Sequence, residues 1–374
     1  MTSHFFYGTL CHEPLLEVVL GHAPDAVAAV LPGHSVFWVT GQAFPMVVEG
    51  GNGARGLLVR NITEEDIARL NFYEGGFGYH ARELPVETQA GEKCGAKVYF
   101  PDRGLWRAGS PWRLADWTER WAVTVVATAR DFMAHYGRGS PDALRRRYGQ
   151  MLVRGASTAR AAQPRPETAS LRRAPAADDV RRHDLRHPYS AYFAVEEHDL
   201  SFRRFDGTMS AVLNRAVLIS GDAAIVLPYD PVRDRVMVIE QFRAGPYARG
   251  DANPWLIEAV AGRIDGGETP EQAARREAVE EAGLVLHRLL PGPSYYPSPA
   301  AKGEYLYSFV GIADLPDQAA GLGGLAAEAE DIRSHVIPFD RLMDLVRTGE
   351  VDNAPLLLLA YWLERKRPDL RAGA

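Results

Sequence analysis

Three acidic side chains lie close together in one short segment of the sequence. Glu277, Glu280 and Glu281 are spaced at i, i+3 and i+4, so in a helix their carboxylates lie on one side. Three like charges at this spacing resist ionising together, and a bound divalent cation removes that conflict. Carboxylate oxygens suit Mg²⁺ or Mn²⁺, and Mg²⁺ commonly links protein carboxylates to substrate phosphates. The pattern therefore predicts a cation site that faces a phosphate group.

The residues on either side predict the helix that positions these glutamates. Thr269 is a suitable N-cap, Pro270 fits the first helical position, and Gln272 completes a capping box. Gly283 supplies a left-handed stop directly after Ala282. We therefore expect a helix of about three turns from Pro270 to Ala282.

The glycines before this helix complete the pattern. Gly262, Gly266 and Gly267 allow a metal ion or a phosphate group to approach the backbone closely. A lone acidic helix is more often a solvated surface helix. The full spacing is more demanding, because it reads G-x5-E-x7-R-E-x-x-E-E-x-G-L from Gly262 to Leu284. This spacing favours a catalytic segment over a solvated surface.

Length and composition limit the class of protein. The chain has 374 residues, which predicts two domains. Hydrophobic residues make up 46% and charged residues 24%, a balance typical of globular proteins. A formal net charge of −6 argues against a nucleic-acid partner, and two cysteines exclude a disulfide framework. The start of the chain has no signal-peptide pattern, and no apolar run approaches the roughly 20 residues of a membrane span. We therefore expect a cytoplasmic protein without a membrane partner.

Composition also divides the chain into two domains and a linker. We expect a first domain over 1–155, a linker over 156–187 and a second domain over 188–374. Alanine, arginine, proline and small polar residues dominate the linker, which is typical of a flexible or partly helical segment. Apolar patterns predict strands over Phe5–Leu10, Ala54–Val59, Lys97–Phe100, Tyr189–Val195, Ala223–Leu227 and Val236–Ile239, and helices over Thr63–Asn71 and Asp116–Tyr136.

The segment from Gly262 to Leu284 resembles the Nudix box throughout. Its one departure is Ala278, where the usual pattern has a larger aliphatic residue. Pro299, 15 residues after Leu284, also fits the bacterial ADP-ribose pyrophosphatase branch of the Nudix hydrolases. Further motifs extend the resemblance over nearly all of Pro188 to Arg367: Phe205–Ser210, Leu227–Asp234, Glu240–Arg243, Pro254–Glu258, Glu330–Arg333 and Asp352–Ala354.

The resemblance implies roles for residues of the box. Glu277 and Glu281 would be catalytic metal ligands, joined by the backbone carbonyl of Ala261. Glu280 would be a further ligand or would support one. The remaining conserved positions of the family pattern would hold the box together, with Arg276 paired to Glu268, and with Gly262 and Gly283 at its two ends.

Residues outside the box are implied to complete the site. The general base of this branch lies in a loop that matches Glu328 to Asp331, and we expect Glu328 as the base. Glu330 would bind an additional metal ion. Arg215, Arg243 and Glu258 would bind the substrate, with the two arginines at its diphosphate.

The resemblance further implies a fold and a reaction. It predicts an α/β/α sandwich with a mixed sheet, in an α+β chain of two domains. It predicts Mg²⁺-dependent hydrolysis of a nucleotide sugar, with Mn²⁺ as a possible substitute. ADP-ribose would give AMP and ribose 5-phosphate, whereas GDP-mannose is an alternative substrate. In this branch the first strands exchange between subunits, so the resemblance also implies a homodimer.

The N-terminal half resembles another family. Tyr7-Gly8-Thr9-Leu10, then Leu70–Gly75 and Tyr79, resemble the gamma-glutamylcyclotransferase-like (AIG2-like) fold, a small β-barrel with helices. In that family the Tyr7–Leu10 loop would bind substrate through backbone N–H groups. Glu74 would take a proton from the attacking α-amine, so that 5-oxoproline forms. Chains that join these two modules resemble a group of tellurite-resistance proteins.

The surroundings of Glu74 suit proton transfer. Phe72, Tyr73 and Phe77 are apolar neighbours in sequence, and such neighbours raise the pKa of a carboxyl group. Asn71 departs from the family pattern, which usually has an aspartate at that position. The alternative is a binding module that senses a metabolite without turnover.

Overall fold

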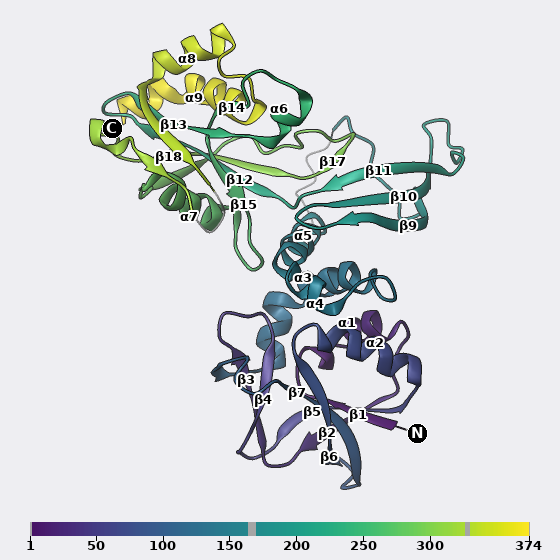
Figure 1. Ribbon diagram of the computed structural model, residues 1–374. Coiled ribbons are helices and arrows are strands. Elements are labelled where there is room, and N and C mark those ends of the chain that lie inside the picture. The colour runs from purple at the N-terminus through teal and green to yellow at the C-terminus, as the bar shows by residue number, and fades with distance from the viewer. Residues whose placement is uncertain (1, 164–169, 326–329, 374) are drawn as a thin grey trace. The chain divides into compact units, whose positions relative to one another are not determined.

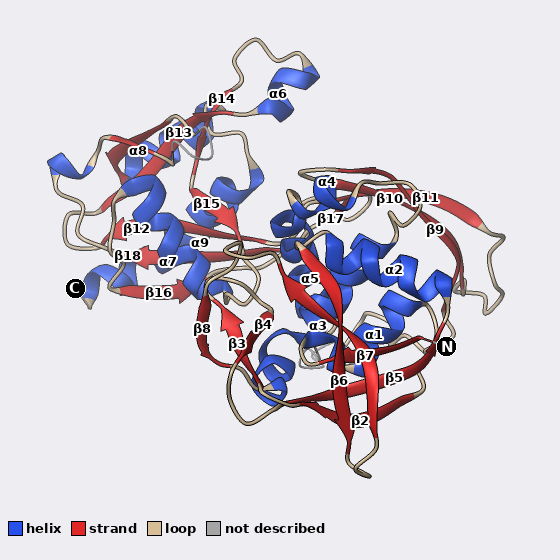
Figure 2. Ribbon diagram, turned by 60° about the horizontal axis from the view of Figure 1, so that its bottom comes forward, coloured by secondary structure: helices blue, strands red, loops and turns tan. Residues whose placement is uncertain are grey.

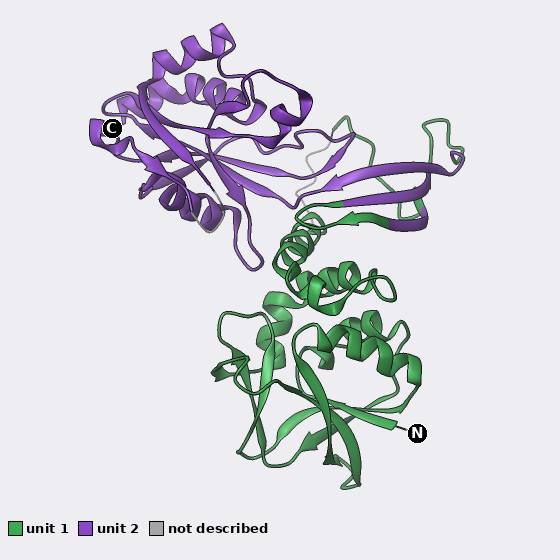
Figure 3. Cartoon of the chain, viewed as in Figure 1, with its two compact units in different colours: residues 1–181, 187–194, 202–209 green, residues 182–186, 195–201, 210–374 purple. Residues whose placement is uncertain are grey.

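A computed structural model of the chain describes residues 2–163, 170–325 and 330–373 (Figure 1). The chain forms two compact units, shown in Figure 3. Unit 1 comprises residues 1–181, 187–194 and 202–209, and unit 2 comprises residues 182–186, 195–201 and 210–374. Each unit has its own apolar clusters, so each has its own core.

Unit 1 is a small β-barrel covered by helices. Its strands are β1 (Thr2–Phe6), β2 (Ala26–Leu31), β3 (His34–Val39), β4 (Pro45–Glu49), β5 (Ala54–Ile62), β6 (Tyr79–Thr88), β7 (Lys93–Pro101) and β8 (Ala108–Pro111). Its helices are η1 (Thr9–Cys11), α1 (Glu13–Leu20), α2 (Glu64–Gly75), α3 (Leu114–Met133), α4 (Pro141–Arg145) and α5 (Tyr148–Ala161). Figure 2 shows the barrel strands in red.

Strand β1 closes the barrel. The strand order is β1-β5-β2-β6-β7, and β1 pairs with β5 antiparallel and with β7 parallel. Successive residues of β1 face opposite sides. Phe5 therefore joins the cluster inside the barrel, whereas Phe6 joins the cluster between the barrel and the helices. A separate three-stranded sheet has the order β4-β3-β8.

The C-terminal half is built on an eight-stranded mixed sheet. The strands of this half are β9 (Val180–Ser190), β10 (Ala194–Phe202), β11 (Leu213–Ile219), β12 (Ala223–Asp230), β13 (Arg235–Phe242), β14 (Trp255–Glu258), β15 (Val260–Arg263), β16 (Arg288–Pro291), β17 (Lys302–Gly303), β18 (Leu306–Ile312), β19 (Leu322–Gly323) and β20 (Ile332–Pro338). The helices are α6 (Ala244–Arg249), α7 (Pro270–Ala282), η2 (Asp317–Ala319), α8 (Phe339–Thr348) and α9 (Ala354–Ala372).

The central strands of this sheet are buried on both faces, which makes the unit a three-layer sandwich. The order is β16-β18-β12-β13-β20-β19, with β14 beside β13 and β15 beside β12. Ile225 and Leu227 pack in the cluster that contains α8 and α9, whereas Ala224 and Val226 pack in the cluster that contains α7. The parallel pair β12–β18 makes the sheet mixed. A second sheet has the order β17-β11-β10-β9.

The predicted fold class is confirmed for both halves, and the predicted helix over 270–282 is observed with those bounds. Two strand predictions have wrong bounds, the one over Phe5–Leu10, since β1 ends at Phe6, and the one over Tyr189–Val195. The segment Tyr189–Val195 is not one strand, because it spans the end of β9, a turn at residues 191–193 and the start of β10. The predicted linker, 156–187, contains the end of α5 and much of β9, whose charged exposed residues show no apolar alternation. The domain boundaries stay a prediction.

The cysteines and the helices add two findings. Cys11 and Cys94 are both free. Among the residues that the structure describes, no helix is both long enough and apolar enough to cross a bilayer.

Candidate active sites

Helix α7 is fixed at both ends by its own sequence. The Thr269 hydroxyl accepts from the N–H of Gln272, and the Gln272 side chain accepts from the N–H of Thr269, which completes the capping box. Gly283 has a φ of 62°, a left-handed conformation that favours glycine, and ends the helix. Ala273 and Ala278 are fully buried against the sheet. The small side chains of this face bring the helix close to β15 and β12.

Glu277 and Glu281 point from α7 towards strand β15 rather than into solvent. Glu277 is 8% exposed and Glu281 is 2% exposed. A Cβ atom on Gly262 would lie 1.8 Å from Oε1 of Glu277, so any larger residue there would displace that carboxylate. Oε2 of Glu281 accepts a hydrogen bond of 3.0 Å from the N–H of Ala261. Two carboxylates of the predicted three are therefore brought to one place.

Arg276 joins the loop before the helix to the acidic face. Its Nε and Nη2 donate to Glu268 at 3.0 Å each, and Nη2 also donates to the carbonyl of Arg263 at 3.0 Å. Its Nη1 donates to Glu277 at 2.6 Å and to Glu280 at 2.9 Å. Arg276 therefore balances part of the acidic charge and fixes the loop against the helix, and Glu280 is held by this arginine.

Burial disfavours the ionised forms of Glu277 and Glu281. Burial raises the pKa of Glu277 to about 7 and the pKa of Glu281 to about 8. The negative charge of Glu330 raises both pKa values further, which places Glu330 within electrostatic range of the pair. A bound cation would favour the ionised form of these groups and so relieve the cost of burying them.

The donor set fits a hard divalent cation. Within residues 2–163, 170–325 and 330–373, no three side chains of His, Cys, Asp or Glu converge to hold an ion. Mg²⁺ does not require three, since it commonly uses one or two carboxylates, several waters and the phosphates of a substrate. The N–H and C=O of a strand residue point to the same side. The carbonyl of Ala261, whose N–H meets Glu281, is therefore expected beside that carboxylate.

A second ion pair lies next to the acidic pair. Nε of Arg243 donates to Oε2 of Glu258 at 2.7 Å, and the Gln241 side chain donates to the same oxygen at 3.2 Å. The charge of Arg243 lowers the pKa of Glu281, so the arginine is near the acidic pair. Burial raises the pKa of Glu258. Arg243 and Glu258 thus form an ion pair within electrostatic range of Glu281, and their role in substrate binding stays a prediction.

For Arg215 and Glu330, the structure gives no hydrogen bond or ion pair to Glu277 or Glu281 among the described residues. Arg215 is exposed on β11, and the hydrogen bond the structure gives it goes to the carbonyl of Asn214. Glu330 accepts a hydrogen bond of 3.1 Å from the N–H of Leu325. Glu328 lies outside the described residues. The roles of Arg215, Glu328 and Glu330 stay predictions.

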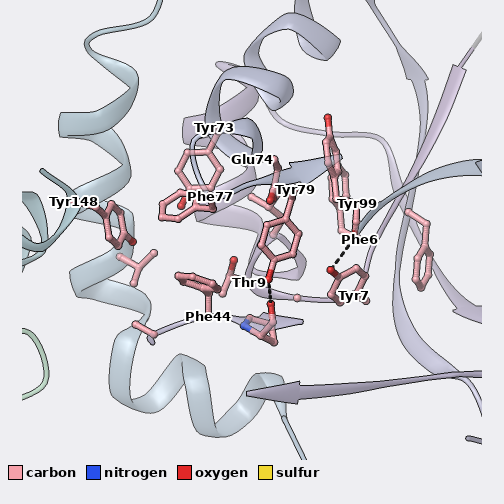
Figure 4. A pocket seen from close by; sticks show the side chains of 16 residues that line it. Phe6, Tyr7, Thr9, Phe44, Tyr73, Glu74, Phe77, Tyr79, Tyr99 and Tyr148 are labelled. Atoms are coloured by element: carbon pink, nitrogen blue, oxygen red, sulfur yellow. Dashed lines mark hydrogen bonds between the residues drawn. The ribbon is translucent and has the colours of Figure 1, made fainter. Parts of the chain in front are cut away.

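Unit 1 contains a separate pocket, shown in Figure 4. It is bounded by the loop after β1, by α2 and by residues of α3 and α5. Most of the side chains that line it are aromatic: Phe5, Phe6, Tyr7, Phe44, Tyr73, Phe77, Tyr79, Tyr99 and Tyr148. The other lining side chains are Thr9, Leu10, Ala43, Pro45, Glu74 and Val125. Glu74 is thus the one carboxylate in an aromatic pocket.

Glu74 is an isolated carboxyl group. Figure 4 shows its side chain pointing into the pocket near Tyr79. Among the described residues the structure gives it no hydrogen bond and no ion pair, and burial raises its pKa to about 8. Burial is the largest cause of the raised pKa values of Tyr7, Tyr73 and Tyr99. The negative charge of Glu74 raises them further, so these three rings lie near Glu74. A cationic or proton-donating group of a ligand would complete this site.

The loop after β1, which is predicted to bind substrate, packs closely against Pro45. Gly8 leaves room for Pro45, because a Cβ atom there would lie 2.9 Å from Cγ of that proline. Thr9 and Leu10 begin helix η1, and the first N–H groups of a helix have no acceptor within it. The predicted strand over Phe5–Leu10 therefore ends at Phe6, and the loop amides remain available to a ligand.

Two features of this pocket were outside the reach of the sequence interpretation. Tyr99 donates to Oδ1 of Asn71 at 2.8 Å, so Asn71 supports a lining residue through its amide oxygen. Tyr148 reaches the pocket from α5, far from the motif residues, and no spacing in the sequence links it to them. Cys11, by contrast, donates to the carbonyl of Phe6, and burial raises its pKa to about 12, which removes it as a nucleophile.

Comparison with known proteins gives matches in both halves. The family described as "Gamma-glutamyl cyclotransferase, AIG2-like" matches residues 4–119, and "NUDIX domain" matches residues 220–359. The ADP-ribose pyrophosphatase of Escherichia coli (strain K12) is 42% identical over 176 residues, which are 47% of this chain and 83% of the relative. The ADP-ribose pyrophosphatase of Haemophilus influenzae is 35% identical over 178 residues, 47% of this chain and 82% of the relative. The GDP-mannose pyrophosphatase of Enterobacter sp. (strain 638) is 33% identical over 150 residues, 40% and 77%.

Proposed function

Because the chain belongs to the Nudix family and carries an AIG2-like domain before its Nudix domain, we propose that it is a metal-dependent hydrolase of nucleotide sugars. The substrate we propose is ADP-ribose, with AMP and ribose 5-phosphate as products. The observation that carries the proposal is the pair of buried carboxylates, Glu277 and Glu281, on a helix fixed beside Gly262. If these carboxylates served only to make the surface soluble, they would be exposed, because burying a charged group costs free energy.

The residues of unit 2 have distinct parts in this reaction. Glu277, Glu281 and the carbonyl of Ala261 would hold Mg²⁺, which supplies charge neutralisation of the diphosphate and an activated water. Arg276 keeps the acidic face and the preceding loop in register. Arg243, with Arg215, binds the diphosphate oxygens, and Glu258 orients Arg243.

The acidic loop before β20 would supply the proton acceptor. We assign the general base to Glu328, and an additional cation to Glu330, which lies within electrostatic range of Glu277 and Glu281. A carboxylate acts as a base on a water that it can reach directly. Glu328→Gln and Glu330→Gln separate the two roles, since loss of the base lowers kcat whereas loss of a ligand weakens the dependence on metal concentration.

A substrate panel tests the proposal on the full chain. ADP-ribose, GDP-mannose and other nucleoside diphosphate sugars are incubated with Mg²⁺ or Mn²⁺, and the released nucleoside monophosphate is measured. We expect the highest kcat/KM for ADP-ribose, since ADP-ribose pyrophosphatases are 42% and 35% identical to this chain and the GDP-mannose enzyme is 33% identical. A preference for GDP-mannose would instead support the alternative substrate. Loss of all turnover with chelated metal, but not with a monovalent salt control, would support the cation requirement.

We propose that the active form is a homodimer joined through the strands before the Nudix domain. Strands β9, β10 and β11 form a sheet with β17 that is separate from the eight-stranded sheet. Apolar side chains on these strands and their connections are exposed, with Phe202 41%, Phe205 96% and Val212 56% exposed. Light scattering of the full chain measures the mass directly, and a monomer at assay concentration contradicts this proposal.

A second function is supported for unit 1 by the isolated Glu74. We propose that its pocket binds a γ-glutamyl amine, in which the α-ammonium group meets Glu74 and the Thr9 and Leu10 amides meet a carboxylate or carbonyl. Glu74 would take a proton from the α-amine as its nitrogen attacks the γ-carbonyl carbon. Glu74 would then return the proton to the amide nitrogen as the C–N bond to the substituent breaks, which releases 5-oxoproline and an amine. Release of 5-oxoproline by the full chain, lost in Glu74→Gln, tests turnover. Binding without release would support a sensing module instead.

A further inference from the structure

The pocket of unit 1 is completed by a residue beyond the region that matches the AIG2-like family. That match covers residues 4–119, whereas Tyr148 is the first residue of α5. Tyr148 lines the pocket, and its ring meets the ring of Phe77 edge to face with centroids 4.7 Å apart. The helical extension of this chain therefore forms one wall of the pocket.

Helix α5 is held in place by close packing and by a buried ion pair. A Cβ atom on Gly155 would lie 2.2 Å from Oγ1 of Thr128 and 2.7 Å from the carbonyl oxygen of Thr124, so glycine lets α5 approach α3 closely. Arg154, which is 4% exposed, donates through Nη2 to Asp131 of α3 at 2.6 Å. These contacts fix the helix that presents Tyr148 to the pocket.

The tyrosines of the pocket differ in what their hydroxyl groups do. Tyr7 donates to the carbonyl of Tyr99, Tyr79 donates to the carbonyl of Pro45, and Tyr99 donates to Asn71. Tyr73 and Tyr148 also line the pocket, and among the described residues the structure gives their hydroxyls no hydrogen-bond partner. Since burial raises their pKa values, both hydroxyls stay protonated and can donate.

The position of Tyr148 indicates which part of a ligand it meets. Figure 4 shows Tyr148 and Tyr7 on opposite sides of the pocket, with Glu74 between them. A γ-glutamyl group held at Glu74 and at the loop after Tyr7 would direct its amide substituent towards Tyr148. This substituent leaves as the amine in the proposed reaction.

The charge of the pocket limits that substituent. Glu74 is the one ionisable side chain of the lining apart from tyrosines, and no lysine, arginine or histidine is among the described lining residues. The γ-glutamyl group already brings one carboxylate and one ammonium group. A second carboxylate on the substituent would be buried without a cation, at a high cost. A neutral acceptor facing a tyrosine hydroxyl avoids that cost.

From these observations we infer that Tyr148 selects γ-glutamyl amines whose substituent is neutral and carries a hydrogen-bond acceptor. The inference rests on the proposed γ-glutamyl site of unit 1 and names the class of substrate that the site takes. Tyr148 donates to the substituent, and Glu74 remains the group that accepts the proton.

Three probes of matched shape test this inference on the full chain. γ-Glutamyl-glycinamide has a neutral acceptor, γ-glutamyl-isobutylamide has the same branched shape without one, and γ-glutamyl-glycine has a carboxylate. Dissociation constants come from calorimetry, and 5-oxoproline release gives turnover. We expect the glycinamide to bind about fivefold more tightly than the isobutylamide. The glycine derivative should bind at least about tenfold more weakly than the glycinamide.

Tyr148→Phe removes the hydroxyl and keeps the ring against Phe77. This variant should bind the glycinamide and the isobutylamide equally, with the isobutylamide affinity unchanged. Tyr189→Phe is the matched control, because Tyr189 is 55% exposed on β9 and does not line the pocket, and it should keep the fivefold difference. Circular dichroism confirms that both variants are folded.

Each result has a defined meaning. If the wild type shows no preference for the glycinamide, or if Tyr148→Phe keeps it, the role of Tyr148 is wrong while the γ-glutamyl site stands. If the preference is present and lost as expected but no 5-oxoproline appears, the selectivity is supported and the cyclotransferase activity is wrong. If no probe binds, both the site and the inference are overturned.

Discussion

Glu281 is a buried carboxylate whose ionisation is unfavourable for the stability of the fold. Its carboxylate accepts a single hydrogen bond from Ala261, and burial raises its pKa to about 8, so ionisation in the folded chain is costly. A residue kept only for stability would be neutral at this position. A bound cation, as we propose for this site, would offset that cost, because it favours the ionised carboxylate.

We predict that Glu281→Gln lowers ADP-ribose turnover by about a hundredfold or more, because the neutral amide is a poor ligand for a hard cation. The amide oxygen can still accept from Ala261, so the melting temperature without metal should stay the same or rise. Steady-state rates and thermal melts measure both effects. Glu271→Gln, an exposed change on the same helix, is the control and should leave rate and melting unchanged. Near-normal turnover in Glu281→Gln would remove Glu281 from the metal site.

Glu74 predicts a pH dependence for the stability of unit 1. Its folded pKa is about 8, above the unperturbed value of about 4.5. The folded chain therefore binds a proton that the unfolded chain releases, and stability falls as pH rises from about 5 to about 9. Relative to Glu74→Gln, the wild type should lose unfolding free energy over this range, as measured by urea melts. Glu119→Gln, an exposed change on α3, should keep the pH dependence of the wild type. Parallel curves for wild type and Glu74→Gln would contradict the raised pKa.

The residues that the sequence revealed are those whose roles depend on local spacing. Thr269, Gly283 and the glutamates of α7 lie within one helix, so their arrangement follows from helical geometry. Gly262 was also found from its spacing to these residues in the sequence. Only the structure shows that a side chain at this position would overlap Glu277. Tyr148 and the Tyr99–Asn71 hydrogen bond join residues far apart in the chain, and no local pattern reports such contacts.

At the scale of elements, strand β19 packs against the backbone of helix α7. A Cβ atom on Gly323 would lie 2.1 Å from the carbonyl oxygen of Glu281 and 2.9 Å from its carbonyl carbon. The N–H of Gly324 donates to the carbonyl of Glu280 at 3.3 Å. Both contacts are made with the backbone of α7, so they hold Gly323 and Gly324 close to the last turn of that helix.

We predict that Gly323→Ala moves β19 away from α7. It should lower kcat for ADP-ribose by about a hundredfold, because we propose the general base in the segment that follows β19 in sequence and small shifts of catalytic groups have effects of that size. KM and the affinity for Mn²⁺ should change little, because Glu277 and Glu281 lie on α7 itself. Gly321→Ala is the matched control, because a Cβ atom there meets nothing within 4 Å. Hydrogen exchange at Gly324 should accelerate in Gly323→Ala alone, which reports the displacement even without an assay. Equal kcat values in the two variants would show that the packing of β19 on α7 does not affect turnover.

Sequence patterns predicted strands and helices of the two cores, but they missed strand β9 in the segment predicted as a linker. Strands β12 and β13 were found because burial on both faces makes them continuous apolar runs. Strand β9 was missed, since its residues are mostly charged and exposed, and pairing of the backbone rather than apolar burial forms it. A composition typical of linkers therefore does not exclude a strand when a neighbouring strand supplies its hydrogen bonds.

At the scale of the whole molecule, the two proposed sites lie in units with separate cores. Each of the four apolar clusters draws its residues from one unit, so a ligand at one site gains its free energy from that unit. A ligand that binds only the folded state stabilises it by about 2.7 kcal/mol at a concentration of 100 times Kd. This stabilisation should appear only in the unfolding of the unit that binds the ligand.

We predict that calorimetry of the full chain resolves two transitions with separate responses. Mg²⁺ with a non-hydrolysable methylene analogue of ADP-ribose should raise the transition of unit 2, and Glu281→Gln should abolish that increase. Glu74→Gln should move only the other transition, most at pH 9, because the buried charge of Glu74 is then removed. In the double variant the two effects should add within about 0.5 kcal/mol, as expected for sites without shared partners. A single transition that responds to both changes would show that the two units unfold together and that binding at either site stabilises the other.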